Sequence, residues 1–184
     1  MRKLRNILTI SAAIFVLSIV NVSAQSYSLA STKSVKSTEQ QIAKKLRGLP
    51  YYGLFDNITY QVNGTSVILS GKVYTLGTKR DAVAAVRDIP GVSNVVNNIQ
   101  DLPPSSFDDR IRRQAYNIFT SRGPAQYFST INPDVRIIVE RGRIFLEGFV
   151  TRESDSNTLN ILALGIPGVF EVQNNLIVGR DVDR

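Results

Sequence analysis

Apolar residues in the N-terminal half of the chain recur first at the period of a helix and then at the period of strands. Residues 38–49 place apolar side chains at spacings of three and four, which predicts a helix with Thr38 as its N-cap. Residues 58–62 alternate apolar and polar side chains, which predicts a strand, and residues 67–74 are expected to return as a second one. Asn63-Gly64 between them is a strong hairpin signal, so the strands are expected to pair antiparallel.

A second helix and a third strand are expected to complete this unit. Thr78 is the expected N-cap of a helix that runs to residue 89, because its apolar residues share one face. Pro90-Gly91 ends that helix, since proline disfavours helical geometry in the residue before it and glycine accepts a positive φ angle. Residues 92–99 then form a third strand, and the predicted order is helix, strand, strand, helix, strand.

The C-terminal half repeats this order of elements. Helices are expected from Asp108 or Asp109 to residue 122 and over residues 155–166, and strands over residues 135–139, 143–150 and 169–178. Identical residues recur 77 positions apart without a gap: Gly71 and Gly148, Pro90 and Pro167, Gly91 and Gly168, Asn97 and Asn174, Asn98 and Asn175. A repeat of this kind indicates two copies of one domain.

The residues that the two copies share are interpreted as parts of the scaffold. Gly71 and Gly148 lie inside predicted strands and belong to no glycine-rich phosphate-binding motif. We expect each of them to mark a bulge or a close approach of a helix to the sheet. The Pro-Gly pairs end helices, and the Asn pairs are interpreted as residues of edge strands or turns.

Two short segments of each copy resemble the BON-domain family. They read VILSGKV at 67–73 and IPGV at 89–92, and IFLEGFV at 144–150 and IPGV at 166–169. The family is found in bacterial periplasmic and outer-membrane-associated proteins, including osmotically induced ones. The resemblance implies an α+β fold of two αββαβ modules, each a small mixed three-stranded sheet with two helices packed on one face. It also implies that the protein binds phospholipid surfaces or envelope proteins, in a stress response, rather than catalysing a reaction.

The N-terminal segment has the plan of a secretory signal peptide. Basic residues among the first five precede an apolar run over residues 7–20 and a small-x-small site that ends at Ala24. That run of about 14 residues is shorter than the roughly 20 that a spanning helix needs. Cleavage after Ala24 and a periplasmic protein are therefore expected. Because the chain has no cysteine to carry a lipid, we expect a protein peripheral to the membrane and not a lipoprotein.

Composition and the repeat together indicate the segments of the whole chain. The predicted segments are a signal peptide at 1–24, a serine-rich flexible leader at 25–37, a first domain at 38–101, a proline-rich linker at 102–106, a second domain at 107–179 and a charged tail at 180–184. The signal peptide carries three of the basic residues and no acidic one, so its loss lowers the formal net charge from +7 to +4.

The chain contains neither histidine nor cysteine. This excludes Ser-His and Cys-His nucleophilic sites and the thiolate or imidazole sites usual for zinc. Carboxylate pairs remain at Asp108-Asp109 and at Glu153 with Asp155, but they stand at predicted helix N-termini, where negative charge is favourable. We therefore expect no catalytic residue, cofactor or metal site, and no enzymatic activity.

A basic and aromatic group lies on the predicted helix that begins the second domain. Its residues are Arg110, Arg112, Arg113, Tyr116 and Phe119. The group is similar to a nucleic-acid surface, but export separates the protein from nucleic acid, so no such partner is expected. The alternatives are a solvated helix face and a surface that attracts anionic lipid headgroups.

The second helices of the two domains differ on the side that points away from the sheet. The first domain has Arg80, Ala84 and Arg87 there, and the second has Asn157, Ile161 and Leu164, with Phe170 in the place of Ser93. Burial of one large apolar side chain is worth roughly 1.5 to 3 kcal/mol, so these residues could stabilise an interface.

Three kinds of contact remain open for this apolar face: the first domain or a second copy of the chain, a membrane, or another protein. The candidate binding residues are Asn157, Ile161, Leu164, Phe170, Arg110, Arg112 and Arg113. Their expected partner is an anionic phospholipid or outer-membrane surface, or an envelope protein. The alternative function is that of a chaperone-like or scaffold protein that binds a protein client or self-associates.

Overall fold

The computed structural model describes residues 37–129 and 132–179, all within one compact unit. The predicted signal peptide, nearly all of the predicted leader and the predicted tail lie outside the described residues. No helix in the described part is both long and apolar enough to cross a membrane.

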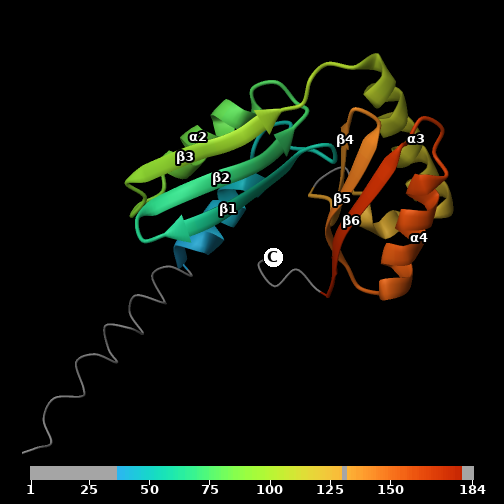
Figure 1. Cartoon of the computed structure of the whole chain (residues 1–184). Coiled ribbons are helices and arrows are strands. Elements are labelled where there is room, and N and C mark those ends of the chain that lie inside the picture. The colour runs from blue at the N-terminus through green and yellow to red at the C-terminus, as the bar shows by residue number, and fades with distance from the viewer. Residues whose placement is uncertain (1–36, 130–131, 180–184) are drawn as a thin grey trace, which may run out of the picture. The chain divides into compact units, whose positions relative to one another are not determined.

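The first domain contains a sheet of strands β1 (Asn57–Asn63), β2 (Ser66–Val73) and β3 (Asn94–Asp101), in the order β1-β2-β3 (Figure 1). β1 and β2 are antiparallel, and β2 and β3 are parallel. A helix over residues 37–47 and helix α2 (Thr78–Arg87) pack on one face of this sheet. Buried side chains from both helices meet those of the strands in one core, including Ile42, Leu46, Val67, Leu69 and Val86.

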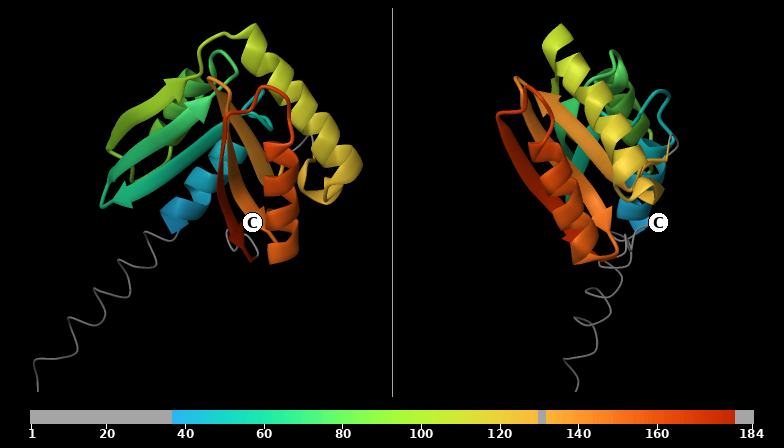
Figure 2. Two further views of the ribbon diagram at one scale, coloured as in Figure 1. Left: turned by 45° about the vertical axis from the view of Figure 1, so that its right-hand side comes forward. Right: turned by 90° about the vertical axis from the view of Figure 1, so that its right-hand side faces the viewer.

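The second domain repeats this arrangement with strands β4 (Val135–Glu140), β5 (Arg143–Val150) and β6 (Glu171–Val178) (Figure 2). Helices α3 (Ser106–Arg122) and α4 (Glu153–Leu164) cover one face of its sheet, and a short 3-10 helix, η1 (Ala125–Tyr127), follows α3. The prediction of an α+β fold with two αββαβ modules, each with a mixed three-stranded sheet, is confirmed.

Gly71 and Gly148 occupy a position that only glycine fits. Their φ angles are 129° and 114°, in a region that other residues rarely adopt. A Cβ atom would lie 2.1 Å from the carbonyl oxygen of Asn57 at Gly71, and 2.0 Å from that of Asp134 at Gly148. The close approach was predicted, but a helix as its cause is wrong: the neighbouring backbone is that of Asn57 in the antiparallel partner strand at Gly71, and that of Asp134, the residue before the partner strand, at Gly148.

Several predicted element ends are wrong by a few residues. Thr38 lies inside the helix over residues 37–47 and is not its N-cap. Helix α2 begins after Gly77, whose φ of 93° makes the turn without a side-chain cap, and Thr78 is a buried first-turn residue. The first hairpin turns at Gly64-Thr65, because Asn63 still pairs with Ser66 in the sheet.

The repeated Asn pairs lie on β3 and β6, which are edge strands as expected. Asn97 Oδ1 accepts a hydrogen bond of 3.0 Å from the backbone N–H of Ile99, and Asn174 Oδ1 accepts one of 3.2 Å from that of Leu176. A side chain thus satisfies a backbone donor of each edge strand, which reduces its tendency to pair with another chain.

Candidate functional site

Helix α4 exposes its predicted outward face. Ile161 and Leu164 are 68% and 58% exposed, whereas Leu159 and Ala163 on the opposite side are fully buried in the core. Asn157 is exposed beside them. The first domain does not cover these side chains, so of the alternatives for this face the contact with the first domain does not apply, while a second copy of the chain, a membrane and another protein remain.

Phe170, in the segment after α4, contacts the start of α3. Its ring is 79% exposed and stacks on Phe107, with 6.2 Å between ring centres and an interplanar angle of 22°. Phe107 in turn packs on Gly168, where a Cβ atom would lie 3.0 Å from the ring. Phe170 also lies against Gly142 in the β4–β5 turn, and its backbone N–H donates to the Gly142 carbonyl at 2.9 Å.

Two exposed arginines flank this aromatic pair. The Arg110 guanidinium carbon lies 5.7 Å from the centre of the Phe107 ring, a cation–π distance. Arg141 stands in the β4–β5 turn next to Gly142. We call Phe107, Arg110, Arg141, Leu164 and Phe170 the aromatic patch of the second domain.

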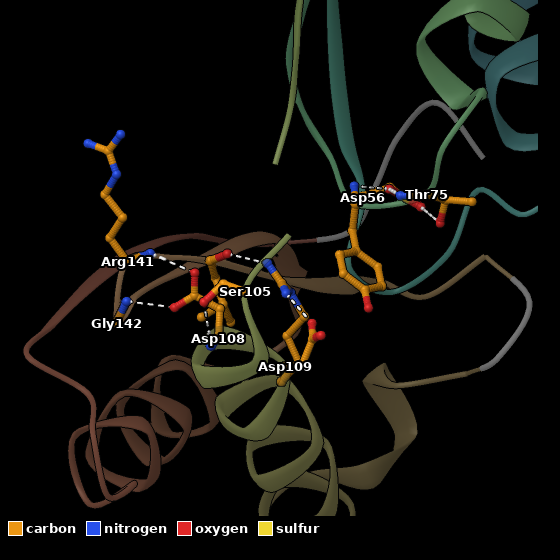
Figure 3. A network of polar contacts seen from close by, with 10 residues as sticks. Asp56, Thr75, Ser105, Asp108, Asp109, Arg141 and Gly142 are labelled. Atoms are coloured by element: carbon orange, nitrogen blue, oxygen red, sulfur yellow. Dashed lines mark hydrogen bonds and ion pairs between the residues drawn. The ribbon is translucent and has the colours of Figure 1, made fainter. Parts of the chain in front are cut away.

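Asp108 holds the turn that carries Arg141. Its buried carboxylate accepts hydrogen bonds from the backbone N–H groups of Arg141 at 2.9 Å and Gly142 at 2.8 Å, while Ser105 Oγ caps α3 at the Asp108 N–H (Figure 3). Arg141 has a φ of 52°, a strained value for a residue other than glycine. The Arg141 side chain extends away from this network (Figure 3). Asp108 therefore acts on the hairpin turn as well as on the helix N-terminus.

Arg112 is not part of an exposed basic surface, so its predicted place in the binding group is wrong. It is 2% exposed and donates hydrogen bonds to Asp109 Oδ1 at 2.6 Å and to the Val139 carbonyl at 2.5 Å. Its guanidinium carbon lies 4.3 Å from the centre of the Tyr74 ring in the first domain. Arg110 and Arg113 are exposed on the same helix, and Phe119, another member of the predicted group, is buried in the core.

The first domain contacts β4 through its loop over residues 51–56. Arg136 donates to the backbone carbonyls of Gly53 at 2.7 Å and Asp56 at 3.1 Å, and its guanidinium carbon lies 4.0 Å from the Tyr52 ring centre. The Ile137 N–H donates to the Leu54 carbonyl at 2.9 Å. Burial raises the pKa of the Tyr52 phenol, although the Arg136 charge acts in the opposite direction.

A cleft of roughly 540 Å³ lies between the first domain, where β1 and the helix over residues 37–47 line it, and the face of the second sheet that α3 and α4 do not cover. Its walls carry positive charge from Arg47 and Arg136 and negative charge from Glu39 and Glu147. The aromatic rings of Tyr52 and Phe149 also line it. Within residues 37–129 and 132–179, no three acidic side chains come close enough together to form a metal site.

Comparison with known proteins identifies one family. The BON domain model matches residues 35–100 and 125–180. Helix α3 lies before the second matched range, yet Ile111, Ala115 and Phe119 place it in the core of that domain.

The solved structures similar to the chain include two of CdsD, a structural protein of the type III secretion system of Chlamydia trachomatis. One, of the C-terminal domain, is 12% identical, with a TM-score of 0.32, and the match covers 76% of this chain and 96% of that one. The other is 13% identical, with a TM-score of 0.28, over 79% of this chain and 94% of that one. No curated protein matches the chain.

Proposed function

The chain belongs to the BON-domain family, with two BON domains, and we propose that it is a non-enzymatic periplasmic protein that binds anionic phospholipid surfaces through the second of them. BON domains are associated with binding to phospholipids and membranes. The observation that carries the proposal is the aromatic patch, in which Leu164 and Phe170 are more than half exposed, Phe170 stacks on Phe107, and Arg110 lies over the Phe107 ring.

The composition of the aromatic patch suits the boundary between lipid headgroups and acyl chains. Aromatic and aliphatic side chains gain free energy there by leaving water, and each arginine near an anionic surface contributes about 1 kcal/mol. The corresponding position of the first domain lacks this chemistry, because Ser93 stands there in the place of Phe170 and its hydroxyl bonds to Thr65 Oγ1 at 2.7 Å. The proposal therefore assigns lipid contact to the second domain.

Phe170→Asp is expected to weaken binding to anionic vesicles about 10- to 100-fold, the loss that corresponds to roughly 1.5 to 3 kcal/mol for one apolar side chain. Leu164→Asp is expected to act in the same direction. The measurement is co-sedimentation with vesicles of phosphatidylcholine alone and of phosphatidylcholine mixed with phosphatidylglycerol.

Ala84→Asp is the matched control, because Ala84 is exposed at the position of the first domain that corresponds to Ile161. It is expected to bind as the wild type does. Raised salt is expected to weaken wild-type binding, since the Debye length falls to about 3 Å at 1 M. Equal recovery of wild type and Phe170→Asp with every vesicle would refute the proposal.

Helix α4 also favours a second candidate, a scaffold or chaperone-like protein. Ile161 stands on a helix that carries no basic residue in its last turn and acidic residues in its first. Such a face lacks attraction for anionic lipid and suits a protein client or a second copy of the chain. Light scattering of wild type and Ile161→Asp tests self-association: a mass above that of the monomer in wild type alone would support it.

A further inference from the structure

Leu76 is a strongly exposed apolar residue of the first domain, at the end of a fixed loop. Leu76, between β2 and α2, is 89% exposed, the highest fraction for a large apolar residue in the described part of the chain. An isolated exposed leucine needs no explanation by itself. What distinguishes Leu76 is how firmly its loop is held and what lies beside it.

Asp56 fixes this loop from within the domain. Its buried carboxylate accepts hydrogen bonds from the backbone N–H groups of Tyr74 at 2.6 Å and Thr75 at 3.1 Å, and from Thr75 Oγ1 at 3.2 Å (Figure 3). A loop that is already ordered loses little conformational entropy when its side chain enters an interface. Leu76 is therefore presented at a low entropic cost.

Tyr74 places the same loop against α3 of the second domain. The Arg112 guanidinium lies over its ring. Burial is the main cause that raises the pKa of the Tyr74 phenol; Asp109 raises it further, and the charges of Arg112 and Arg113 lower it. The loop that carries Leu76 thus lies beside the first turns of α3, the helix that also carries Phe107 and Arg110.

The contact between the domains keeps this arrangement fixed. Arg136 of β4 donates to the backbone carbonyl of Asp56, the residue whose carboxylate holds the loop. Lys72, one residue before the end of β2, pairs with Glu140 at 2.5 Å. Leu76 is therefore held relative to α3 and does not depend on the flexibility of a linker.

We infer that Leu76 of the first domain and the aromatic patch of the second form one surface that docks on an anionic phospholipid membrane. The inference rests on the proposed function. Charge complementarity selects this partner: the side chains of Arg110 and Arg113 on α3 and of Arg141 in the β4–β5 turn are exposed, whereas Arg80, next to the Leu76 loop, pairs with Asp81 at 3.2 Å. Guanidinium groups at headgroup level with apolar side chains below them match such a membrane.

Single cysteines test the inference directly, because the chain has none of its own. Leu76→Cys, Phe170→Cys and Ala84→Cys are labelled with an environment-sensitive fluorophore and mixed with vesicles of phosphatidylcholine alone or with phosphatidylglycerol. We expect a blue shift and a rise in emission at positions 76 and 170 with anionic vesicles, and none at position 84, which faces solvent on α2.

Leu76→Ser gives the matching affinity measurement. It is expected to weaken binding to anionic vesicles about tenfold. The midpoint of thermal unfolding should not change, since the side chain is exposed. A response at position 170 without one at 76, together with wild-type affinity of Leu76→Ser, would overturn this inference and leave the proposed function standing.

Two further outcomes would overturn the inference. If the wild type binds neither vesicle, the inference falls together with the proposed function. If position 76 responds equally to neutral and anionic vesicles, the surface is not specific for anionic lipid and the inference is overturned.

Discussion

Gly148→Ala is expected to lower the free energy of unfolding by about 3 to 5 kcal/mol, a large part of the roughly 5 to 15 kcal/mol that is typical of a native protein. The new Cβ atom would lie 2.0 Å from the Asp134 carbonyl oxygen, and that oxygen accepts a hydrogen bond from the Phe149 N–H at 3.0 Å. Strands β4 and β5 must separate locally to admit the methyl group. A φ of 114° adds strain of its own.

The matched control is Gly91→Ala. It separates the cost of a positive φ angle from the cost of the contact between the Cβ atom and a backbone carbonyl. Gly91 has a φ of 92°, but a Cβ atom there meets nothing within 4 Å. It is expected to cost about 1 to 2 kcal/mol. Urea unfolding followed by circular dichroism measures both. Equal losses for the two variants would mean that the strands relax around the methyl group, and the close backbone approach would then not be what requires glycine at positions 71 and 148.

The arrangement of the elements could be predicted because the local signals and the repeat agree. Pro90-Gly91 and Pro167-Gly168 each follow a helix, and the spacing of Gly71 and Gly148 aligned the hairpins. The N-caps were wrong for a physical reason. A threonine before an apolar stripe suggests a cap, but Thr78 is buried, and Gly77 makes the turn by its own conformation.

The exposed part of the candidate site was predicted by comparing the copies, and the buried part was not. Helical periodicity correctly assigns Ile161 and Leu164 to the outward face of α4. The same periodicity cannot tell that the first domain covers Arg112 on α3. A signal did exist: Ile138 replaces Gln61 on the outer sheet face and is buried, as expected only if another element covers that face.

Asp56 and Asp108 show a second limit of sequence reasoning. Each carboxylate is buried and accepts hydrogen bonds from backbone groups of a distant loop. Asp108 is 33 residues from Arg141 in the sequence, so no local pattern connects them. A position near a helix N-terminus explained the charge of Asp108 but not its contact with the turn.

Arg112→Met is expected to lower the free energy of unfolding by about 2 to 4 kcal/mol, and to weaken the contact between the domains. Methionine keeps much of the volume but removes the donors to the buried Val139 carbonyl and to Asp109. It also removes the cationic group that lies over the Tyr74 ring. A buried acceptor is then left without its partner, and the ring loses its contact.

Arg113→Met is the control, because Arg113 is exposed on the next position of the same helix and should cost less than about 0.5 kcal/mol. Urea unfolding gives both free energies, and hydrogen exchange reports the contact. In Arg112→Met we expect faster exchange of the Ile137 N–H, which bonds to the Leu54 carbonyl across the domains. If that amide exchanges at the wild-type rate while stability falls, Arg112 stabilises only its own domain. The Leu76 loop would then be held beside α3 by Arg136 and Lys72 alone.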